Sequence, residues 1–198
     1  ILKSIIKQLS PIAGTILLDG DSVADMTYKA FSQKAAVVLT ERVNPELMTC
    51  RDIVATGRYP YTGHLGLLTP EDEEKVQTAM ETVHVEELAG RSFNEISDGQ
   101  RQRILLARAL CQEPEILFLD EPTAYLDIRY KLELLDILRR MTRERGITVI
   151  MSLHEIDLAQ KVADKVICVR GDKIFHYGTP AEVFNDSVIR ELYDIRDG

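Results

Sequence analysis

Two adjacent carboxylates follow a short apolar run in the chain. Residues 116–119 (ILFL) are all apolar, which is typical of a strand buried inside a parallel sheet. Asp120 and Glu121 come directly after this run, and Pro122 restricts the direction in which the chain continues. An acidic turn after a strand is common in proteins of many kinds. In a phosphoryl-transfer site, the first carboxylate would hold Mg²⁺ and the second would orient or deprotonate the attacking water.

A second polar group lies upstream, in the segment ISDGQRQR at residues 96–103. Ser97 is a good helix N-cap, and Gly99 would let the backbone approach a ligand closely. The N–H groups at the start of a helix, together with a serine hydroxyl, can bind an anion. Most Ser-x-Gly helix starts are only capped helices. The position of this one just before the acidic strand favours a binding role.

The elements that must position these residues alternate along the chain. Apolar runs and turn signals predict strands at residues 15–19, 35–39, 116–120 and 147–152 and a hairpin over 166–177. Helical periodicity and caps predict helices at residues 1–9, 27–34, 49–57, 70–83, 97–111, 127–145, 155–162, 180–184 and 187–193. This order predicts an α/β fold with a parallel-sheet core, which binds ligands at the carboxyl ends of its strands.

The composition excludes several classes of protein. The formal net charge of −8 over 198 residues argues against a broad nucleic-acid surface, which needs clustered Lys and Arg. The three widely spaced cysteines predict reduced thiols rather than a disulfide framework or a metal site. No apolar run approaches the length needed to cross a bilayer, and no signal peptide is visible.

Three motifs in this order resemble the ATP-binding subunits of ABC transporters. ISDGQRQR resembles their signature loop, with Asp98 where the family more often has Gly; ILFLDEPTAYLD resembles their Walker B strand and D-loop; SLHEIDLA resembles their switch region. The resemblance implies a P-loop NTPase-like fold. An α-helical subdomain at about residues 41–112 would be inserted in a catalytic core formed by residues 1–40 and 113–198.

The resemblance also implies a role for each matching residue, with ATP and Mg²⁺ as cofactors. Asp120 would bind Mg²⁺ and Glu121 would activate the water. His154 would contact the γ-phosphate, although a lone histidine after a strand is more often structural. The predicted nucleotide-binding residues are Ser97, Asp98, Gly99, Gln100, Asp127 and Thr40. Asp127 is also a good N-cap for the helix predicted over residues 127–145.

The family's Q-loop glutamine has no counterpart here. After the strand predicted at residues 35–39, the chain has Thr40 followed by Glu41. Our alignment places Thr40 at the position of the glutamine. The threonine hydroxyl is shorter and would reach the metal less easily, whereas Glu41 would add negative charge. Thr40 or Glu41 would then be the further metal-contacting residue.

The P-loop sequence G-x-x-x-x-G-K-[ST] does not occur in the chain. In the family the P-loop leads into a helix like ILKSIIKQL, then a turn and a strand such as TILLDG. The resemblance therefore implies a truncated cassette that begins just after its P-loop and lacks its N-terminal strands. Without that phosphate cradle, the chain alone is expected to bind ATP weakly or not at all and to be inactive.

The segment GRYPYTG is similar to the corresponding part of importers of iron–siderophore, haem and cobalamin, as is GTPAEVF. This similarity implies a homodimer that sandwiches two nucleotides on the cytoplasmic face of the inner membrane, as a peripheral subunit. Transmembrane permease subunits would contact residues 42–70. An extracytoplasmic substrate-binding protein would act indirectly, and no nucleic-acid partner is expected.

Two other functions fit parts of the sequence. One is a soluble ABC-type ATPase that acts on nucleic acid or ribosomes. The net acidity and GRYPYTG argue against it. The other is a non-catalytic regulatory module that has lost its P-loop. Asp120, Glu121 and His154 argue against this alternative, because a site without nucleotide gains nothing from keeping them.

Overall fold

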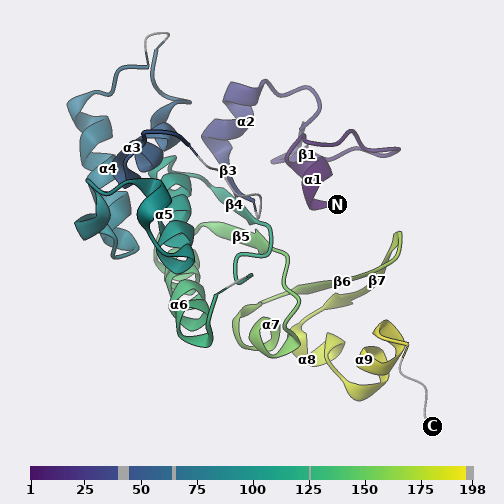
Figure 1. Ribbon diagram of the computed structural model, residues 1–198. Helices are drawn as coiled ribbons and strands as arrows, with labels where there is room; N and C mark the ends of the chain where they lie inside the picture. The colour runs from purple at the N-terminus through teal and green to yellow at the C-terminus, as the bar shows by residue number, and fades with distance from the viewer. Residues whose placement is uncertain (40–44, 64–65, 125, 195–198) are drawn as a thin grey trace. The chain divides into compact units, whose positions relative to one another are not determined.

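The computed structural model describes residues 1–39, 45–63, 66–124 and 126–194 (Figure 1). The chain divides into two compact units, Ile1–Ser152 and Leu153–Gly198, and each is described by itself. The inserted subdomain expected at about residues 41–112 stays a prediction.

A parallel sheet of three strands forms the centre of the first unit. Its order is β3 (Ala35–Val38), β4 (Ile116–Leu119) and β5 (Thr148–Met151). Both neighbouring pairs are parallel, and the register places Val38, Leu119 and Met151 side by side at the carboxyl end. This confirms the parallel core. It also brings the residues after β4 and β5 to the same edge of the sheet.

The two outer strands of this sheet are protected unequally. Side chains from the helix Asp98–Cys111 and from its C-cap residue Gln112 cover the outer edge of β3. Arg108 Nη2 donates to the Val37 carbonyl at 3.2 Å, and Gln112 Nε2 donates to the Ala35 carbonyl at 2.8 Å. These bonds satisfy backbone acceptors that a bare edge would expose. On the other outer strand, Ile150 of β5 is 39% exposed, unlike the residues of β3 and β4.

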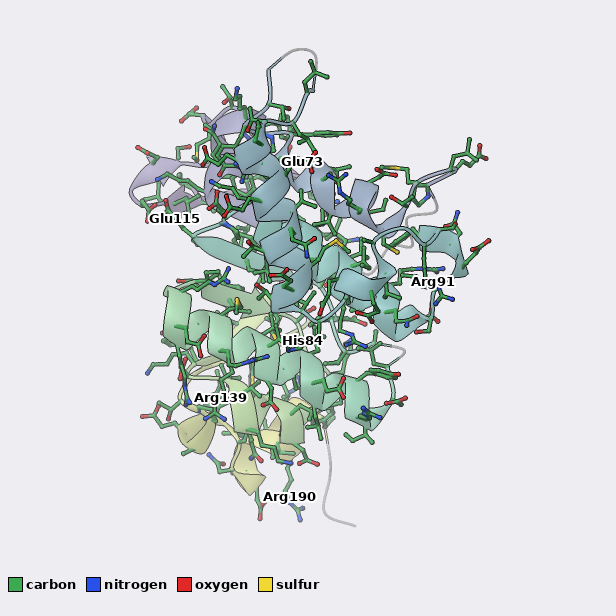
Figure 2. All side chains as sticks on the ribbon, turned by 90° about the vertical axis from the view of Figure 1, so that its left-hand side faces the viewer. Glu73, His84, Arg91, Glu115, Arg139 and Arg190 are labelled. Atoms are coloured by element: carbon green, nitrogen blue, oxygen red, sulfur yellow. The ribbon has the colours of Figure 1, made fainter. Side chains whose placement is uncertain are left out.

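Side chains cap four helices of the first unit: α3 (Cys50–Ala55), α4 (Pro70–Thr82), α5 (Asp98–Cys111) and α6 (Ile128–Arg145). α5 packs against β3 and α6 against β5. Thr49, Thr69 and Ser97 form capping boxes, and Asp127 caps α6. Each cap satisfies N–H groups that have no partner inside the helix. α3, α4 and α5 pack together in one group (Figure 1). Figure 2 shows outward-facing side chains on α4 and α6, among them Glu73 and Arg139.

Short 3₁₀ turns connect these helices at η1 (Thr56–Arg58), η2 (Glu86–Leu88) and η3 (Phe93–Glu95). The largest fully buried side chains of the first unit are Phe93, Phe118, Met80, Ile104, Leu106 and Leu117. Cys50 and Cys111 are free and buried in this unit, in agreement with the expected reduced thiols. Burial raises the pKa of the Cys111 thiol to about 11.

The N-terminal segment departs from the prediction in length. It contains α1 (Leu2–Ile5), β1 (Leu17–Leu18), β2 (Asp21–Ser22) and α2 (Tyr28–Lys34). The predicted helix over residues 1–9 is wrong beyond Ile5, because Lys7 takes a left-handed φ of 63°. That conformation lets the Lys7 ammonium donate to the Met26 carbonyl at 2.5 Å, a contact between distant parts of the sequence.

The second unit contains α7 (Ile156–Val162), β6 (Val166–Arg170), β7 (Lys173–Gly178), α8 (Pro180–Val183) and α9 (Asp186–Leu192). β6 and β7 pair antiparallel, which confirms the expected hairpin, and Gly171 takes the positive φ of 60° in its turn. The small core of the unit is formed by Cys168, Val183 and Val188.

A buried arginine connects three elements of the first unit. Arg58, which is 4% exposed, donates from Nε to Asp72 Oδ1 at 2.8 Å. Its Nη1 donates to the Cys111 carbonyl at 2.8 Å and to Glu113 Oε2 at 3.0 Å. The guanidinium carbon lies 4.1 Å from the centre of the Tyr61 ring. Arg58 therefore connects η1 with the N-terminus of α4 and the C-terminal end of α5.

We expect the free energy of unfolding to fall as the pH drops from about 4 to about 2. The Thr69 backbone N–H and hydroxyl, and then the Arg58 guanidinium, lower the pKa of Asp72 to about 2. The pKa of an unfolded aspartate is about 3.9, so the ionised carboxylate stabilises the fold above that pH. This contribution of about 2 kcal/mol is lost as the pH falls through the folded pKa. Urea unfolding at pH 5, 4 and 3 follows the first part of this loss.

The control for this pH dependence is Asp72→Asn, which cannot ionise. It should be less stable than the parent at pH 5, and its stability should change less between pH 5 and pH 3. Equal pH dependence in the two proteins would contradict the assignment to Asp72.

Candidate functional site

The two predicted carboxylates lie at the carboxyl end of β4, where one serine contacts both residues. Ser152 directly follows β5, and its hydroxyl donates to Asp120 Oδ1 at 2.9 Å. The same oxygen accepts the Glu121 backbone N–H at 2.8 Å. All three residues are half-buried. The strand register thus gathers Asp120, Glu121 and Ser152 at one point of the sheet edge.

The backbone at Glu121 is in an unusual conformation. Its φ is +47°, in the left-handed region, which costs a residue with a side chain about 1–2 kcal/mol. The Glu121 carbonyl accepts the Ala124 N–H at 3.0 Å, closing a tight turn. Pro122 and Thr123 within this turn are buried. Strain of this kind persists only where neighbouring groups hold the backbone, and it is frequent at functional sites.

The residues present fit a magnesium ion bound together with a nucleotide. Among the described residues, no group of three or more His, Cys, Asp or Glu side chains could hold a metal alone. Mg²⁺ is usually bound by one or two carboxylates, and substrate phosphates and water fill its other positions. Asp120 at the sheet edge matches that mode of binding.

The predicted signature segment forms the start of α5. The Ser97 hydroxyl accepts the Gln100 N–H at 3.3 Å, and Gln100 Oε1 accepts the Ser97 N–H at 3.0 Å. The Asp98 carboxylate lies 3.6 Å from Arg101 Nη1. Ser97 and Asp98 are exposed and Gln100 is half-buried. The N-cap predicted at Ser97 is confirmed, and the predicted nucleotide contacts of this turn stay predictions.

Gly99 lies against the beginning of α6. A Cβ at this position would lie 3.2 Å from the Tyr130 ring, closer than side chains normally pack. The Tyr130 N–H is accepted by the Asp127 carboxylate at 3.1 Å, which confirms Asp127 as the N-cap of α6. Packing against Tyr130 thus favours a small residue at position 99, and the predicted approach of Gly99 to a ligand stays a prediction.

Three further predicted residues have no described position relative to this arrangement. Thr40 and Glu41 fall outside the described residues. His154 belongs to the second unit, where it is exposed just before α7. Its contact with the γ-phosphate therefore stays a prediction.

Ser152 is the residue of this site that sequence reasoning missed. It ends the strand predicted over residues 147–152 and begins the switch-region segment SLHEIDLA, in which only His154 was assigned a role. The signal that could have found it is its position, because a polar residue that ends a strand beside β4 must lie near the residues after β4.

Comparisons with known proteins identify the family. The family model described as ABC transporter matches residues 1–124. Over 197 residues, the chain is 42% identical to an uncharacterized ABC transporter ATP-binding protein of Methanocaldococcus jannaschii. That alignment covers 100% of this chain and 68% of the archaeal protein. The chain belongs to the ABC transporter ATP-binding family, as its motifs indicated.

Two further similarities extend over nearly the whole chain. The iron(3+)-hydroxamate import ATP-binding protein of Bacillus subtilis is 32% identical over 195 residues, or 98% of this chain and 72% of that protein. The solved structure of CbiO1 from Clostridium perfringens, part of the ABC transporter complex CbiONQ, has a TM-score of 0.78 and 28% identity. It covers 98% of this chain and 77% of CbiO1, and it confirms the fold class. Every helix in the described residues is too short or too polar to span a bilayer.

Proposed function

We propose that this chain is part of the ATP-hydrolysing subunit of an ABC importer that carries iron–siderophore, haem or cobalamin. The observation that best supports this proposal is the pair Asp120 and Glu121. Ser152 holds both residues at the carboxyl end of β4, in a chain of this family. Parallel sheets bind their ligands at this end. The cargo class is supported by the GRYPYTG segment and by the similarity to the iron(3+)-hydroxamate import protein.

Each residue of the site would have a separate task in hydrolysis. Asp120 would hold Mg²⁺, which supplies positive charge against the phosphates. Glu121 would accept a hydrogen bond from the attacking water and orient or deprotonate it. His154 would donate to the γ-phosphate oxygens, where negative charge must be stabilised. The P-loop that would cradle these phosphates is not among the 198 residues.

The predicted homodimer would complete each site with residues from two copies. Ser97, Asp98 and Asp127 are exposed, as residues that meet a partner across a nucleotide must be. Gly99, Gln100 and the Q-loop position Thr40 complete the proposed nucleotide contacts. The start of α5 from one copy would then face the carboxylates of the other.

The surface proposed to meet the permease carries exposed apolar side chains. Within residues 42–70, Leu47 is 101% exposed, Tyr59 is 60% exposed and Leu67 is 71% exposed. Tyr59 directly follows the buried Arg58, so it extends from an anchored turn. Such side chains are typical of protein contact surfaces. The subunit would then lie on the cytoplasmic face of the membrane, and a substrate-binding protein would act through the permease.

Co-purification tests this proposal against the alternatives. The chain in its complete protein should be recovered from detergent-solubilised membranes together with a transmembrane subunit. Tyr59→Ala and Leu67→Ala together should reduce that recovery, whereas Tyr28→Ala, which removes an aromatic ring that is 72% exposed outside residues 42–70, should not. Recovery with nucleic acid or ribosomes in place of a membrane subunit would favour the soluble ATPase.

We expect the 198-residue chain alone to bind Mg-ATP weakly or not at all. A P-loop supplies the lysine and the backbone N–H groups that hold the phosphates, and the chain has no such sequence. Titration calorimetry measures this directly. A form that carries a P-loop segment ahead of Ile1 is the positive control and should bind. Tight, saturable binding to the 198-residue chain would mean that other residues cradle the phosphates.

A further inference from the structure

We propose that Ser152 is a positioning residue for hydrolysis, whose hydroxyl sets the placement of Asp120 and Glu121 relative to each other. The inference rests on the proposed ATPase function. Ser152 is the first residue of SLHEIDLA, where the resemblance assigned a role only to His154. It is carried by the hydrogen bonds that join the end of β5 to the two residues after β4.

The two contacts fix the direction of the hydroxyl proton. A serine hydroxyl has one hydrogen to donate and two lone pairs to accept with. The Glu121 N–H uses a lone pair at 2.8 Å, so the hydrogen points away from it, to Asp120 Oδ1 at 2.9 Å. The bonds therefore run from an amide N–H, through the hydroxyl, to a carboxylate oxygen, and each polarises the next. This series of hydrogen bonds ends at the carboxylate proposed to hold Mg²⁺.

The position of Ser152 is itself fixed by the sheet. Its backbone N–H donates to the Leu119 carbonyl at 3.0 Å, which continues the β4–β5 ladder by one residue. Leu119 immediately precedes Asp120. The strand register, and not a flexible loop, therefore places the Ser152 hydroxyl beside the turn that follows β4. The backbone of any residue at position 152 would reach this place, but a hydroxyl can both donate to the carboxylate and accept from the amide through a single atom.

The left-handed backbone of Glu121 needs a hydrogen bond that holds it in place. At a φ of +47° the side chain leaves the backbone in a direction that helical or extended conformations do not give. The Ser152 hydroxyl holds the Glu121 N–H, and the Ala124 N–H holds the Glu121 carbonyl at 3.0 Å. Loss of the first contact would let the residue relax towards an unstrained conformation. The water-activating carboxylate would then leave its place beside Asp120.

The matched variants are Ser152→Thr and Ser152→Val. Both are β-branched and nearly equal in shape, and both suit the end of a strand. Only threonine keeps the hydroxyl, so the difference between them reports its hydrogen bonds at nearly the same side-chain shape.

The first measurement needs no nucleotide. Amide hydrogen exchange in the 198-residue chain, followed by NMR, should show the Glu121 N–H exchanging at least about tenfold faster in Ser152→Val than in Ser152→Thr. The Ala124 N–H should follow in the same direction, because it closes the same turn. Equal exchange in the two variants would overturn the proposed contact.

The second measurement uses a form that carries a P-loop. In Ser152→Val, kcat should fall about ten- to a hundredfold, the range for losing a hydrogen bond to a charged group, with a smaller change in the KM for ATP. The Mg²⁺ concentration for half-maximal activity should rise. In Ser152→Thr, kcat and the Mg²⁺ requirement should both lie close to their values in the parent. A loss of stability alone would not produce this difference between the two variants.

The outcomes separate this inference from the function on which it rests. An active parent with equal kcat in the two variants would overturn the positioning role and leave the ATPase proposal standing. An inactive parent that binds Mg-ATP would overturn the ATPase proposal, and the role of Ser152 in hydrolysis would fall with it.

Discussion

Glu121→Gln, in a form of the protein that carries a P-loop, should bind ATP nearly as well as the parent and turn it over at least about a hundredfold more slowly. Glutamine has the shape of glutamate and can still accept a hydrogen bond from water, but it cannot take a proton. The Ser152 hydroxyl bonds to the backbone of residue 121 and not to its side chain. The substitution therefore leaves the turn in place and tests the carboxylate alone.

Steady-state hydrolysis and ATP binding by titration calorimetry measure the two halves of this prediction. The control is Glu115→Gln, which makes the same change just before the amino end of β4 (Figure 2). Glu115 is exposed, and its backbone groups bond to Lys34 and Thr148 whatever its side chain. This control should keep nearly full activity. Near-normal turnover in Glu121→Gln would remove Glu121 from the water-activating role.

Local signals predicted much of the framework that carries this carboxylate. Ser97 and Asp127 cap α5 and α6 as expected, because a capping side chain contacts N–H groups only a few residues away. The parallel sheet followed from alternating apolar runs and helices. Such features depend on residues that are close together in the sequence, so the sequence is enough to predict them.

Contacts between distant residues were not predictable in the same way. Ser152 reaches Asp120 through the register of β4 and β5, and its place at the end of a strand does not by itself specify the hydrogen bonds that it makes there. The left-handed backbone of Glu121 was equally hidden, because an acidic turn is compatible with several conformations. The left-handed backbone of Lys7, which accompanies its bond to the distant Met26 carbonyl, ends α1 early. In each case a tertiary contact overrode the local pattern.

The buried side chain of Arg58 is a further feature that the sequence did not predict. The segment GRYPYTG indicated an aromatic loop at the surface, and Tyr59 is indeed 60% exposed. Its neighbour Arg58 points inward and binds residues 14, 53 and 55 positions away. Gly57 is forced by the same packing, since a Cβ there would lie 2.3 Å from the Arg108 carbonyl oxygen. The exposed tyrosine thus extends from a buried anchor.

Arg58→Ala should lower the free energy of unfolding of the first unit by about 3–5 kcal/mol. The truncation leaves the Asp72 carboxylate, which is 7% exposed, without a charged partner, and it removes the donor to the Cys111 carbonyl. It also removes the cation that stacks on Tyr61. The free energy of unfolding of Arg58→Lys should lie between those of the parent and Arg58→Ala. An ammonium group cannot reproduce the planar fork that binds several acceptors.

The matched control is an exposed pair of the same kind. Arg129 Nε lies 2.9 Å from Glu133 Oε1, nearly the distance between Arg58 Nε and Asp72 Oδ1, but the Arg129 side chain is 80% exposed. Arg129→Ala should change stability little, since water replaces the partner of each charge. Urea unfolding followed by circular dichroism compares the variants, with Arg58→Ala/Asp72→Ala as the double variant. That double variant should be destabilised by less than the sum of the single variants, because it leaves no unpaired charge behind. Equal effects at Arg58 and Arg129 would show that burial does not determine the strength of these pairs, and the anchor assigned to Arg58 would be wrong.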